Sequence, residues 1–599
     1  MNKRELSEAD ICDHCITPAL EQAGWPKAQI RREYTLTQGR IIVRGKLVAR
    51  GKRKRADYVL FHHPNQPIAV IEAKDNKHSI GAGMQQALGY ADLLDVPFIF
   101  SSNGDGFLLH DRSGTYPKTE QEMGLDAFPS PDELWERYKQ WRQVEDVPET
   151  LLASRYYPST EGKEPRYYQQ LAINRTIEAI GKGQKRCLLV MATGTGKTYT
   201  AIGAMRNLLQ EYRQRDHSLL VVITVPMTHL AKQWAESLAD FDYLSPKLLY
   251  GSHRTDWKSA LQSLIDDMEL GLSEAEIIIT THQTGSTSFF RQQVRSADCD
   301  SLVIADEVHN LGAEHRRKGL VQEFDYRLGL SATPERFYDE EGTEFLFRYF
   351  DKTVFEFTLS DAIPEYLTPY EYYPRIVEMD GEELGRYRKI SHKLARLSNS
   401  DDTDIEETRE RLLTKRANIL KSARRKYDEL EAILDEIDID HLLVYTNFEQ
   451  IDEVQKRMAD RGVVQHRFTA EEDDEERQRL LTAFAEGRYE ALVAMKCLDE
   501  GVDVPSTRQA ILMANSRNPK EFVQRRGRVL RQHSESGKEK AVIYDMVVVP
   551  TTDPDAELAA SEKGILTREL ERFEEFAATS LNEDQARLAL QDIRREFEV

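Results

Sequence analysis

The stretch "RCLLVMATGTGKT", residues 186–198, joins an apolar run to a glycine-bearing loop. The apolar run predicts a buried strand, and the residues after the loop predict a helix. A loop in this position turns backbone N–H groups toward phosphates at a helix N-terminus. We therefore expect it to bind a nucleotide, with Lys197 at the β- and γ-phosphates and Thr198 on Mg²⁺. The loop residues expected to surround the phosphates are Gly194, Thr195 and Gly196.

A second apolar run ends in a pair of carboxylates, in "LVIADEVH", residues 302–309. Acidic groups after such a run are costly to bury unless they bind a cation. We expect Asp306 to bind the Mg²⁺ of the nucleotide and Glu307 to orient or deprotonate the attacking water.

The arrangement of apolar runs predicts an α/β protein with several domains. From about residue 165, runs such as "SLLVVITV" and "SLVIAD" alternate with helical stretches, and a second series begins at "HLLVYTN". This alternation is typical of parallel sheets. The expected domains are residues 1–150, a first lobe at 151–340, a second lobe at 341–550 with a helical insertion at 378–440, and a helical tail at 551–599.

These residues and their order resemble superfamily 2 helicases and translocases with a DExH box, which implies two RecA-like lobes and an ATP cofactor. In that resemblance Gln169 of "RYYQ" reads the adenine base. The residues that would couple hydrolysis to lobe movement are Ser331 and Thr333 of "SAT", His309, and Gly501 and Asp503 of "CLDEGVDVP". The residues that would reach the γ-phosphate are Gln524, Arg528 and Arg531 of "QRRGRVLR". An arginine there would neutralise charge that develops during phosphoryl transfer.

The N-terminal region carries a different acidic pattern, in "IAVIEAKDNK", residues 68–77. Strand side chains alternate, so Glu72 and Lys74 share one face. Asp57 lies on the preceding strand and completes D-x14-E-x-K, with Ala56 where the common pattern has proline. Two acids and a lysine suit Mg²⁺ beside a scissile phosphate. A strand that merely reaches solvent is the alternative.

This spacing resembles the PD-(D/E)xK nucleases, and the whole N-terminal block resembles the R subunits of type I restriction enzymes. Gln86 and Tyr90 lie one helical turn apart and match an element that accompanies the nuclease motif. Glu8 resembles an auxiliary acid, although a helix-start carboxylate favoured by the helix dipole would look the same. Gln86 and Tyr90 could equally be packing residues.

A basic run precedes Asp57: "RGKLVARGKRKR", residues 44–55, holds seven basic residues in twelve. The chain as a whole carries a net charge of −21, so any nucleic-acid contact depends on local patches of this kind. We expect the basic side chains to hold DNA near the nuclease site, and a solvated hairpin is the alternative. The residues concerned are Arg50, Lys52, Arg53, Lys54 and Arg55.

The resemblance implies an ATP-dependent duplex-DNA translocase with an Mg²⁺-dependent endonuclease, acting in restriction of foreign DNA. It also implies separate partner subunits for sequence recognition and methylation, although the helical region after the second lobe is shorter than in the family. Two other readings stay open: a DNA-repair helicase whose N-terminal domain only binds DNA, and a remodeller in a defence complex that does not cut.

Composition limits the setting in which the protein works. The chain has 599 residues, 40% of them hydrophobic, and no run approaches the roughly 18–20 apolar residues of a membrane span. Its five scattered cysteines fit a reducing compartment. The N-terminus lacks the apolar core of a secretory signal. We therefore expect a cytoplasmic protein, and the resemblance implies a prokaryotic one.

Overall fold

The computed structural model describes most of the chain, in two compact units. The described residues are 3–37, 41–44, 47–50, 54–153, 165–243, 245–251, 256–273, 275–335, 339–363, 366–397, 403–469, 472, 474–495, 504, 506–514, 529–531, 538–551 and 560–597. The first unit comprises Met1–Ala192 with Gly196–Thr358, and the second comprises Leu359–Val599 with Thr193–Thr195. Within the described residues, no helix has the length and apolar character needed to cross a membrane.

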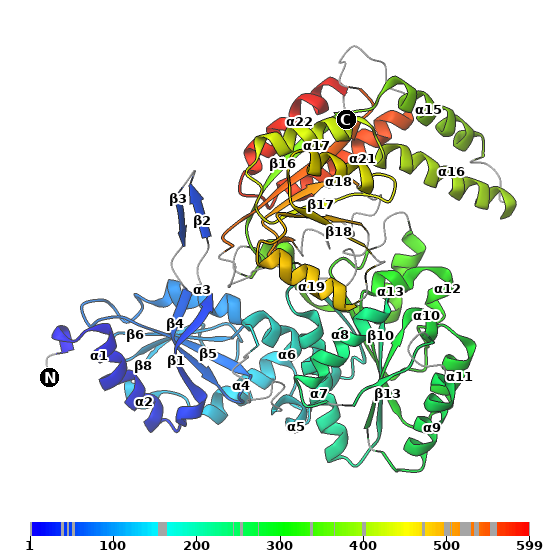
Figure 1. Ribbon diagram of the computed structural model, residues 1–599. Helices are drawn as coiled ribbons and strands as arrows, with labels where there is room; N and C mark the ends of the chain where they lie inside the picture. Colours follow the sequence, from blue (N-terminus) through cyan, green and yellow to red (C-terminus); the bar gives the residue numbers. More distant parts are fainter. Residues whose placement is uncertain are drawn as a thin grey trace. The chain divides into compact units, whose positions relative to one another are not determined.

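The N-terminal domain is built on a mixed sheet (Figure 1). Its described strands pair in the order β1-β4-β5-β6-β7-β8, and only β5 and β6 run parallel. The strands are β1 (Ile30–Thr37), β4 (Lys54–Phe61), β5 (Pro67–Ala73), β6 (Phe98–Ser102), β7 (Phe107–Asp111) and β8 (Glu120–Met123). A separate antiparallel hairpin is formed by β2 (Ile41–Arg44) and β3 (Leu47–Arg50).

Helices cover both faces of this sheet. The parallel pair β5–β6 requires a crossover, and α3 (Met84–Leu94) supplies it. Val59, Val70 and Ile99, from three adjacent strands, pack with the apolar side of α3. On the opposite face, the hydroxyl of Tyr58 donates to the Cys12 carbonyl oxygen at 3.0 Å. That carbonyl belongs to a helical stretch made of α1 (Glu8–Ile11), a π-helical segment (Cys12–Ile16) and α2 (Thr17–Gln22).

The first lobe is a parallel sheet with helices between its strands, as the sequence predicts. Its described strands lie in the order β11-β12-β10-β13-β14-β9-β15. They are β9 (Arg186–Met191), β10 (Leu219–Val225), β11 (Lys247–Leu248), β12 (Ala275–Thr281), β13 (Asp300–Ala305), β14 (Tyr326–Ser331) and β15 (Lys352–Phe357). The main helices are α7 (Lys197–Gln214), α8 (Thr228–Ala239), α9 (Trp257–Glu269), α10 (His282–Gly285), α11 (Ser288–Ser296), α12 (Glu314–Arg317) and α13 (Glu340–Phe350). Because β15 pairs with β9, the lobe's sheet extends past residue 340.

The second lobe is a second parallel sheet, in the order β16-β21-β20-β17-β19-β18 for its described strands. The strands are β16 (Tyr370–Glu378), β17 (Leu442–Tyr445), β18 (Gln465–Phe468), β19 (Ala491–Ala494), β20 (Gln509–Leu512) and β21 (Ala541–Val549). The helices are α14 (Leu359–Ala362), α15 (Gly381–Arg396), α16 (Thr403–Lys421), α17 (Arg425–Glu436), α18 (Ile451–Asp460), α19 (Asp474–Ala485), α21 (Ala560–Ala577) and α22 (Glu583–Phe597). The two parallel sheets confirm the predicted α/β class with two RecA-like lobes.

A helical joint connects the N-terminal domain to the first lobe inside the first unit. It consists of α4 (Pro131–Arg142), α5 (Glu149–Ala153) and α6 (Tyr167–Gly181). Tyr138 of α4 donates its hydroxyl hydrogen to Glu178 of α6 at 3.0 Å, in a buried position. Arg175 of α6 forms ion pairs with Glu178 at 2.6 Å and with Asp95, which directly follows α3. The Arg175–Glu178 pair lies within α6, whereas the Arg175–Asp95 pair and the buried Tyr138–Glu178 hydrogen bond connect α6 to other elements and hold the two parts together.

Candidate functional site

Three carboxylates of the N-terminal domain converge at one end of its sheet. Glu8 comes from the start of α1, Asp57 from β4 and Glu72 from β5. One oxygen from each lies within 4.8 Å of the others. The Asp57 carboxylate also accepts a hydrogen bond from the Ala73 backbone N–H at 2.7 Å, which holds it against the end of β5. The structure thus brings together all three acids that the sequence pattern and the resemblance single out.

Lys74 is the cation of this cluster. Its ammonium nitrogen lies 2.9 Å from Glu72 Oε1 and 3.4 Å from Glu8 Oε1. Burial alone would disfavour its charged form, but the hydrogen bond and negative charge of Glu72 outweigh burial and raise the pKa of Lys74. The amine therefore stays protonated. One cation stands against three carboxylates, so the cluster retains negative charge when all its acids are ionised.

Glu72 is the most deeply buried carboxylate of the cluster. Its side chain is 1% exposed, and its Oε2 atom is buried without a hydrogen-bond partner. Burial, followed by the charge of Asp57, raises the pKa of Glu72 to about 8. Burial also raises the pKa of Asp57. A divalent cation would relieve these effects, because oxygen ligands with unused lone pairs are what Mg²⁺ binds. The residues present therefore fit a metal of this kind.

Two further features of α3 shape the cluster. Gln86 donates from Nε2 to the Tyr90 hydroxyl oxygen at 2.7 Å, so the two predicted residues form a pair on the helix. Burial raises the pKa of Tyr90, which also senses the charges of Glu72 and Asp57. Gly83, at the start of α3, was not predicted. A Cβ there would lie 2.9 Å from Glu72 Cγ, so only glycine lets the helix approach Glu72 this closely.

The predicted DNA-binding run is only partly described. Arg50 lies in β3 and Lys54 begins β4, while Lys52 and Arg53 lie outside the described residues. Arg55 has a described side chain; it is exposed and lies 3.3 Å from Glu33 Oε2. Part of its charge is therefore neutralised by its neighbour on β1.

In the first lobe, the predicted nucleotide loop runs from β9 to the start of α7. Gly194 and Gly196 have φ angles of +84° and +86°, a backbone conformation that residues with a Cβ rarely adopt. A Cβ on Gly196 would also collide with the Gln169 side chain, so Gln169 of α6 lies directly against the loop.

Three side chains of the loop and of the first turn of α7 are also described. Lys197 donates from Nζ to the Met191 carbonyl oxygen at 3.3 Å. Thr195 is almost wholly buried, and Thr198 lies in the first turn of α7.

The acidic pair lies at the end of β13, opposite Lys197. The Lys197 ammonium is 3.9 Å from Glu307 Oε1. Glu307 has a φ of +45°, a left-handed conformation that is strained for a residue with a side chain. His309 lies 3.5 Å from Glu307 Oε2 and 3.3 Å from the Ser331 hydroxyl oxygen, which in turn accepts from the Thr333 backbone N–H at 3.1 Å. A continuous polar chain therefore links the acidic pair to "SAT".

Trp234 and His282 are site residues whose roles the sequence did not reveal. Both side chains are buried. The Trp234 indole N–H donates to Asp306 Oδ2 at 2.9 Å. The His282 Nε2 atom lies 3.1 Å from the Asp306 carbonyl oxygen, and burial lowers the pKa of His282 to about 3. Both hold Asp306, whose own pKa is raised by burial. A buried tryptophan needs a partner for its N–H, which was the available signal.

Four predicted residues of the second lobe, Gly501, Asp503, Gln524 and Arg528, lie outside the described residues. Arg531 is described. Its carbonyl oxygen accepts from the Thr368 hydroxyl at 3.2 Å and from Lys538 Nζ at 3.1 Å. These contacts anchor the backbone at Arg531.

Three family models match the chain in succession. Residues 8–129 match the N terminus of type I restriction enzyme R proteins, residues 162–336 the res subunit of type III restriction enzymes, and residues 425–533 the conserved C-terminal helicase domain. A solved fragment assigned as an HsdR subunit of a type I restriction enzyme from Vibrio vulnificus YJ016 has the same fold. It is 27% identical, covers 92% of this chain and 95% of its own, and has a TM-score of 0.65. The chain is therefore similar to the R subunits of type I restriction enzymes, in its N-terminal domain and in its overall fold.

Similarity to curated relatives points the same way. The Escherichia coli type I restriction enzyme EcoAI endonuclease subunit is 38% identical over 391 residues, which is 63% of this chain and 45% of that protein. The EcoKI endonuclease subunit of Escherichia coli is 22% identical, over 84% of this chain and 48% of its own. The R-subunit-like chain thus spans about half the length of these two relatives. The DNA 3'-5' translocase XPB2 of Sulfurisphaera tokodaii is 27% identical, over 68% of this chain and 87% of its own.

Replacing Glu72 with glutamine should stabilise the metal-free protein at alkaline pH. The folded state holds the Glu72 proton up to a pKa of about 8, against an ordinary value of 4.5. The contribution of this group to stability is therefore full below about pH 4.5 and is lost as pH rises through 8. One pKa unit corresponds to about 1.4 kcal/mol, so we expect Glu72→Gln to gain about 1–3 kcal/mol at pH 9 and almost nothing near pH 5.

Native-state hydrogen exchange of residues 67–73, corrected for intrinsic rates and measured with chelator present, checks this expectation. Glu122→Gln is the control, because Glu122 is an exposed carboxylate on β8 of the same sheet. Equal gains in the two variants, or a gain that does not depend on pH, would contradict the assigned cause.

Replacing Trp234 with phenylalanine should weaken the use of Mg²⁺ in ATP hydrolysis. Phenylalanine keeps the buried ring but removes the N–H that orients Asp306. Loss of a group that orients a metal ligand typically costs about 10–100-fold in affinity or activity. We expect a rise of at least about tenfold in the Mg²⁺ concentration for half-maximal ATPase rate. Trp257→Phe, in the core of the same lobe, should leave that concentration unchanged.

Proposed function

We propose that the chain is an ATP-driven translocase on duplex DNA that carries an Mg²⁺-dependent endonuclease and acts in restriction of foreign DNA. One observation carries this proposal: Glu8, Asp57 and Glu72 converge with Lys74 at a strand end, in the same chain as a nucleotide-binding lobe. The matches to type I restriction subunits, which extend over most of the chain, support it.

For the nuclease, the proposed roles follow from position and charge. Bound Mg²⁺ would contact the scissile phosphate and lower the pKa of an attacking water. Asp57 and Glu72 are the proposed metal ligands, with Glu8 as an auxiliary acid. Lys74 remains charged beside them and faces the developing negative charge on the phosphate. The Gln86–Tyr90 pair supports α3 next to this cluster.

For the motor, the proposed site uses the loop at residues 192–198 and the acidic pair of β13. Lys197 binds the β- and γ-phosphates, Thr198 and Asp306 are the ligands for the nucleotide's Mg²⁺, and Glu307 orients the attacking water. His309 contacts both Glu307 and Ser331. Loss of the γ-phosphate next to Glu307 would therefore alter the contacts of Ser331 in "SAT". Gln169 is the proposed adenine reader. Gly501, Asp503, Gln524, Arg528 and Arg531 are the proposed contributions of the second lobe.

The proposed partners are double-stranded DNA and separate subunits for sequence recognition and methylation. The relatives are described as endonuclease subunits of type I restriction enzymes, which supports a multi-subunit setting. A second candidate is a translocase or remodeller that does not cut DNA. It is favoured by the match to XPB2, which covers 87% of that translocase.

Single substitutions in the two proposed sites should distinguish the DNA-cleavage activity from the ATPase activity. Plasmid DNA is incubated with the protein, Mg²⁺ and ATP, alone and together with the products of neighbouring genes. Asp57→Ala should abolish cleavage, because it removes a metal ligand, and should leave the ATPase rate within about twofold. Lys197→Ala should reduce ATP hydrolysis by at least about 100-fold, since it removes the phosphate-binding cation.

Cleavage that is unaffected by Asp57→Ala would overturn the nuclease assignment. An absence of cleavage under every combination, with DNA-stimulated ATPase intact, would favour the non-cutting remodeller. Glu122→Gln is the matched control for the first variant, because Glu122 lies on the same sheet away from the acidic cluster.

Neutralising the basic run should weaken DNA binding in a salt-dependent manner. Each DNA phosphate that the protein no longer neutralises reduces the slope of log affinity against log salt by about 0.9 for duplex DNA. Replacing all five residues with glutamine should therefore reduce the slope by about 2–4, as measured by fluorescence anisotropy without nucleotide. The residues are Arg50, Lys52, Arg53, Lys54 and Arg55. Replacing Lys27 and Lys118, two exposed lysines of the same domain, should change it little. An unchanged slope in the five-residue variant would exclude this DNA-binding role.

A further inference from the structure

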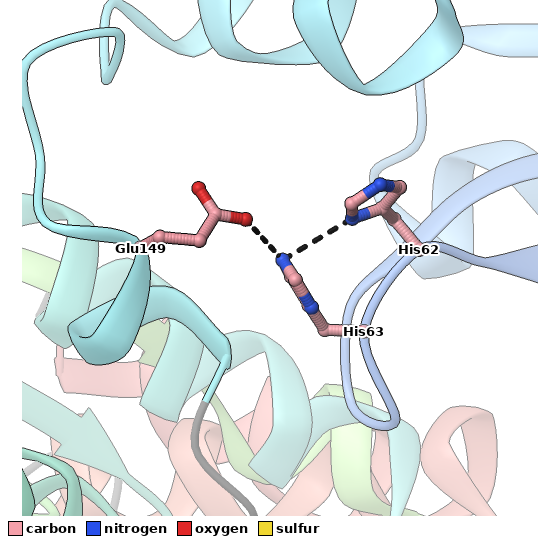
Figure 2. A group of neighbouring side chains, drawn as sticks. All are labelled: His62, His63 and Glu149. Atoms are coloured by element: carbon pink, nitrogen blue, oxygen red, sulfur yellow. Dashed lines mark hydrogen bonds and ion pairs between the residues drawn. The ribbon is translucent and has the colours of Figure 1, made fainter. Parts of the chain in front are cut away.

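A second group of metal-ligating side chains lies away from both proposed active sites, where the N-terminal domain meets the helical joint. His62 and His63 occupy the turn between β4 and β5, and Glu149 begins α5. Figure 2 shows the three side chains pointing toward one another, with His63 between the other two. One ligand atom from each lies within 4.8 Å of the other two.

The distances in this group suit a small cation with nitrogen ligands. His62 Nδ1 lies 3.1 Å from His63 Nε2, and His63 Nε2 lies 2.5 Å from Glu149 Oε1. Ligand atoms around a tetrahedral Zn²⁺ with bonds of about 2.0–2.1 Å are separated by about 3.3 Å. Small rotations of the side chains would therefore bring the three atoms to coordination distance.

The ligands also have orienting partners of the type that metal sites use. His62 Nε2, the ring nitrogen turned away from His63, lies 3.4 Å from Asp132 Oδ1. A carboxylate on the second nitrogen of a histidine fixes its tautomer and presents the first nitrogen to a metal. The Trp135 indole N–H donates to Glu149 Oε1 at 3.1 Å, and the Trp135 ring stacks on His62 at 4.7 Å. These contacts distinguish the group from a chance cluster of surface side chains.

We propose that His62 Nδ1, His63 Nε2 and the Glu149 carboxylate bind a divalent transition metal of the Zn²⁺ class. Imidazole nitrogen favours Zn²⁺, Co²⁺ or Ni²⁺, whereas the all-oxygen cluster at Glu72 favours Mg²⁺. With three protein ligands, the fourth position is left to water or to a group from a partner.

Such a metal would brace the N-terminal domain against the first lobe. Two ligands come from the turn between β4 and β5, the strands that carry Asp57 and Glu72, and the third comes from α5. That helix packs on α6 and on α7, the helix that begins with Lys197. Thr150 of α5 also bonds to Glu211 of α7. The metal would thus tie the strands of the acidic cluster to the helix that follows the nucleotide loop.

The test measures Zn²⁺ binding by the full-length protein after metal removal with a chelator. Titration against a chromophoric competitor in excess Mg²⁺ gives affinity and stoichiometry, with Mg²⁺ present to occupy oxygen-ligand sites. We expect one tight equivalent per chain, weakened by at least about 100-fold in His63→Gln and in Glu149→Gln, because each removes one of three ligands. His110→Gln is the control, because His110 is also paired with a carboxylate, Glu120, at 3.1 Å.

Asp57→Ala distinguishes this site from the acidic cluster and should leave the Zn²⁺ affinity unchanged. X-ray absorption of the Co²⁺-loaded wild-type protein should show two imidazole ligands, a readout that does not depend on the folding of any variant. The proposal is overturned if no stoichiometric binding is found, or if binding survives in both ligand variants. It is also overturned if Asp57→Ala alone removes the binding. In the first case the group is a metal-free hydrogen-bonded joint.

Discussion

The cost of burying a carboxylate is the constraint around which both proposed sites are organised. Glu72 and Asp306 each lie where an apolar strand ends, with almost no exposure to water. An ionised carboxylate in such a place needs compensating charge or hydrogen bonds. At Asp306 the compensation includes the Trp234 indole and the nearby Lys197. At Glu72 it is incomplete, because one lysine serves three acids and one Glu72 oxygen is left without a partner. Because this negative charge is only partly compensated, the N-terminal cluster is suitable for binding a divalent cation.

The two proposed sites are connected to the rest of the first unit by different kinds of contact. In the first lobe, the route runs through side chains: Glu307, His309 and Ser331 lie in contact from one strand end to the next. In the N-terminal domain it runs through packed elements, since β4 and β5 lead into the turn at His62 and His63, which contacts α4 and α5. The acidic cluster at Glu72 and the acidic pair of β13 therefore belong to the same compact unit, with α4, α5 and α6 between them in the chain.

Much of the fold and of the candidate sites could be predicted from local pattern. The alternation of apolar strands and helices predicts both parallel sheets, and the alternation within β5 places Glu72 and Lys74 on one face. Other features escaped prediction. In β8 every second side chain is exposed, and in β18 three of the four side chains are only half-buried. Neither strand therefore appears in the sequence as a hydrophobic run. Trp234 donates to Asp306 from 72 residues away, and Gly83 approaches Glu72 from a different element, and no pattern within one element encodes either contact.

By itself, the sequence determined which groups are candidates for the chemistry: the expected phosphate-binding loop, the two strand-end acidic patterns and the lysine beside one of them. These follow from spacing along a single strand or turn, where backbone geometry is regular. Only the tertiary structure decided how those groups are held. The convergence of Glu8 with Asp57 and Glu72, the indole on Asp306, and the meeting of His62 and His63 with Glu149 each require packing between distant segments. Such contacts depend on how whole elements fill space together, and spacing along the chain does not specify that.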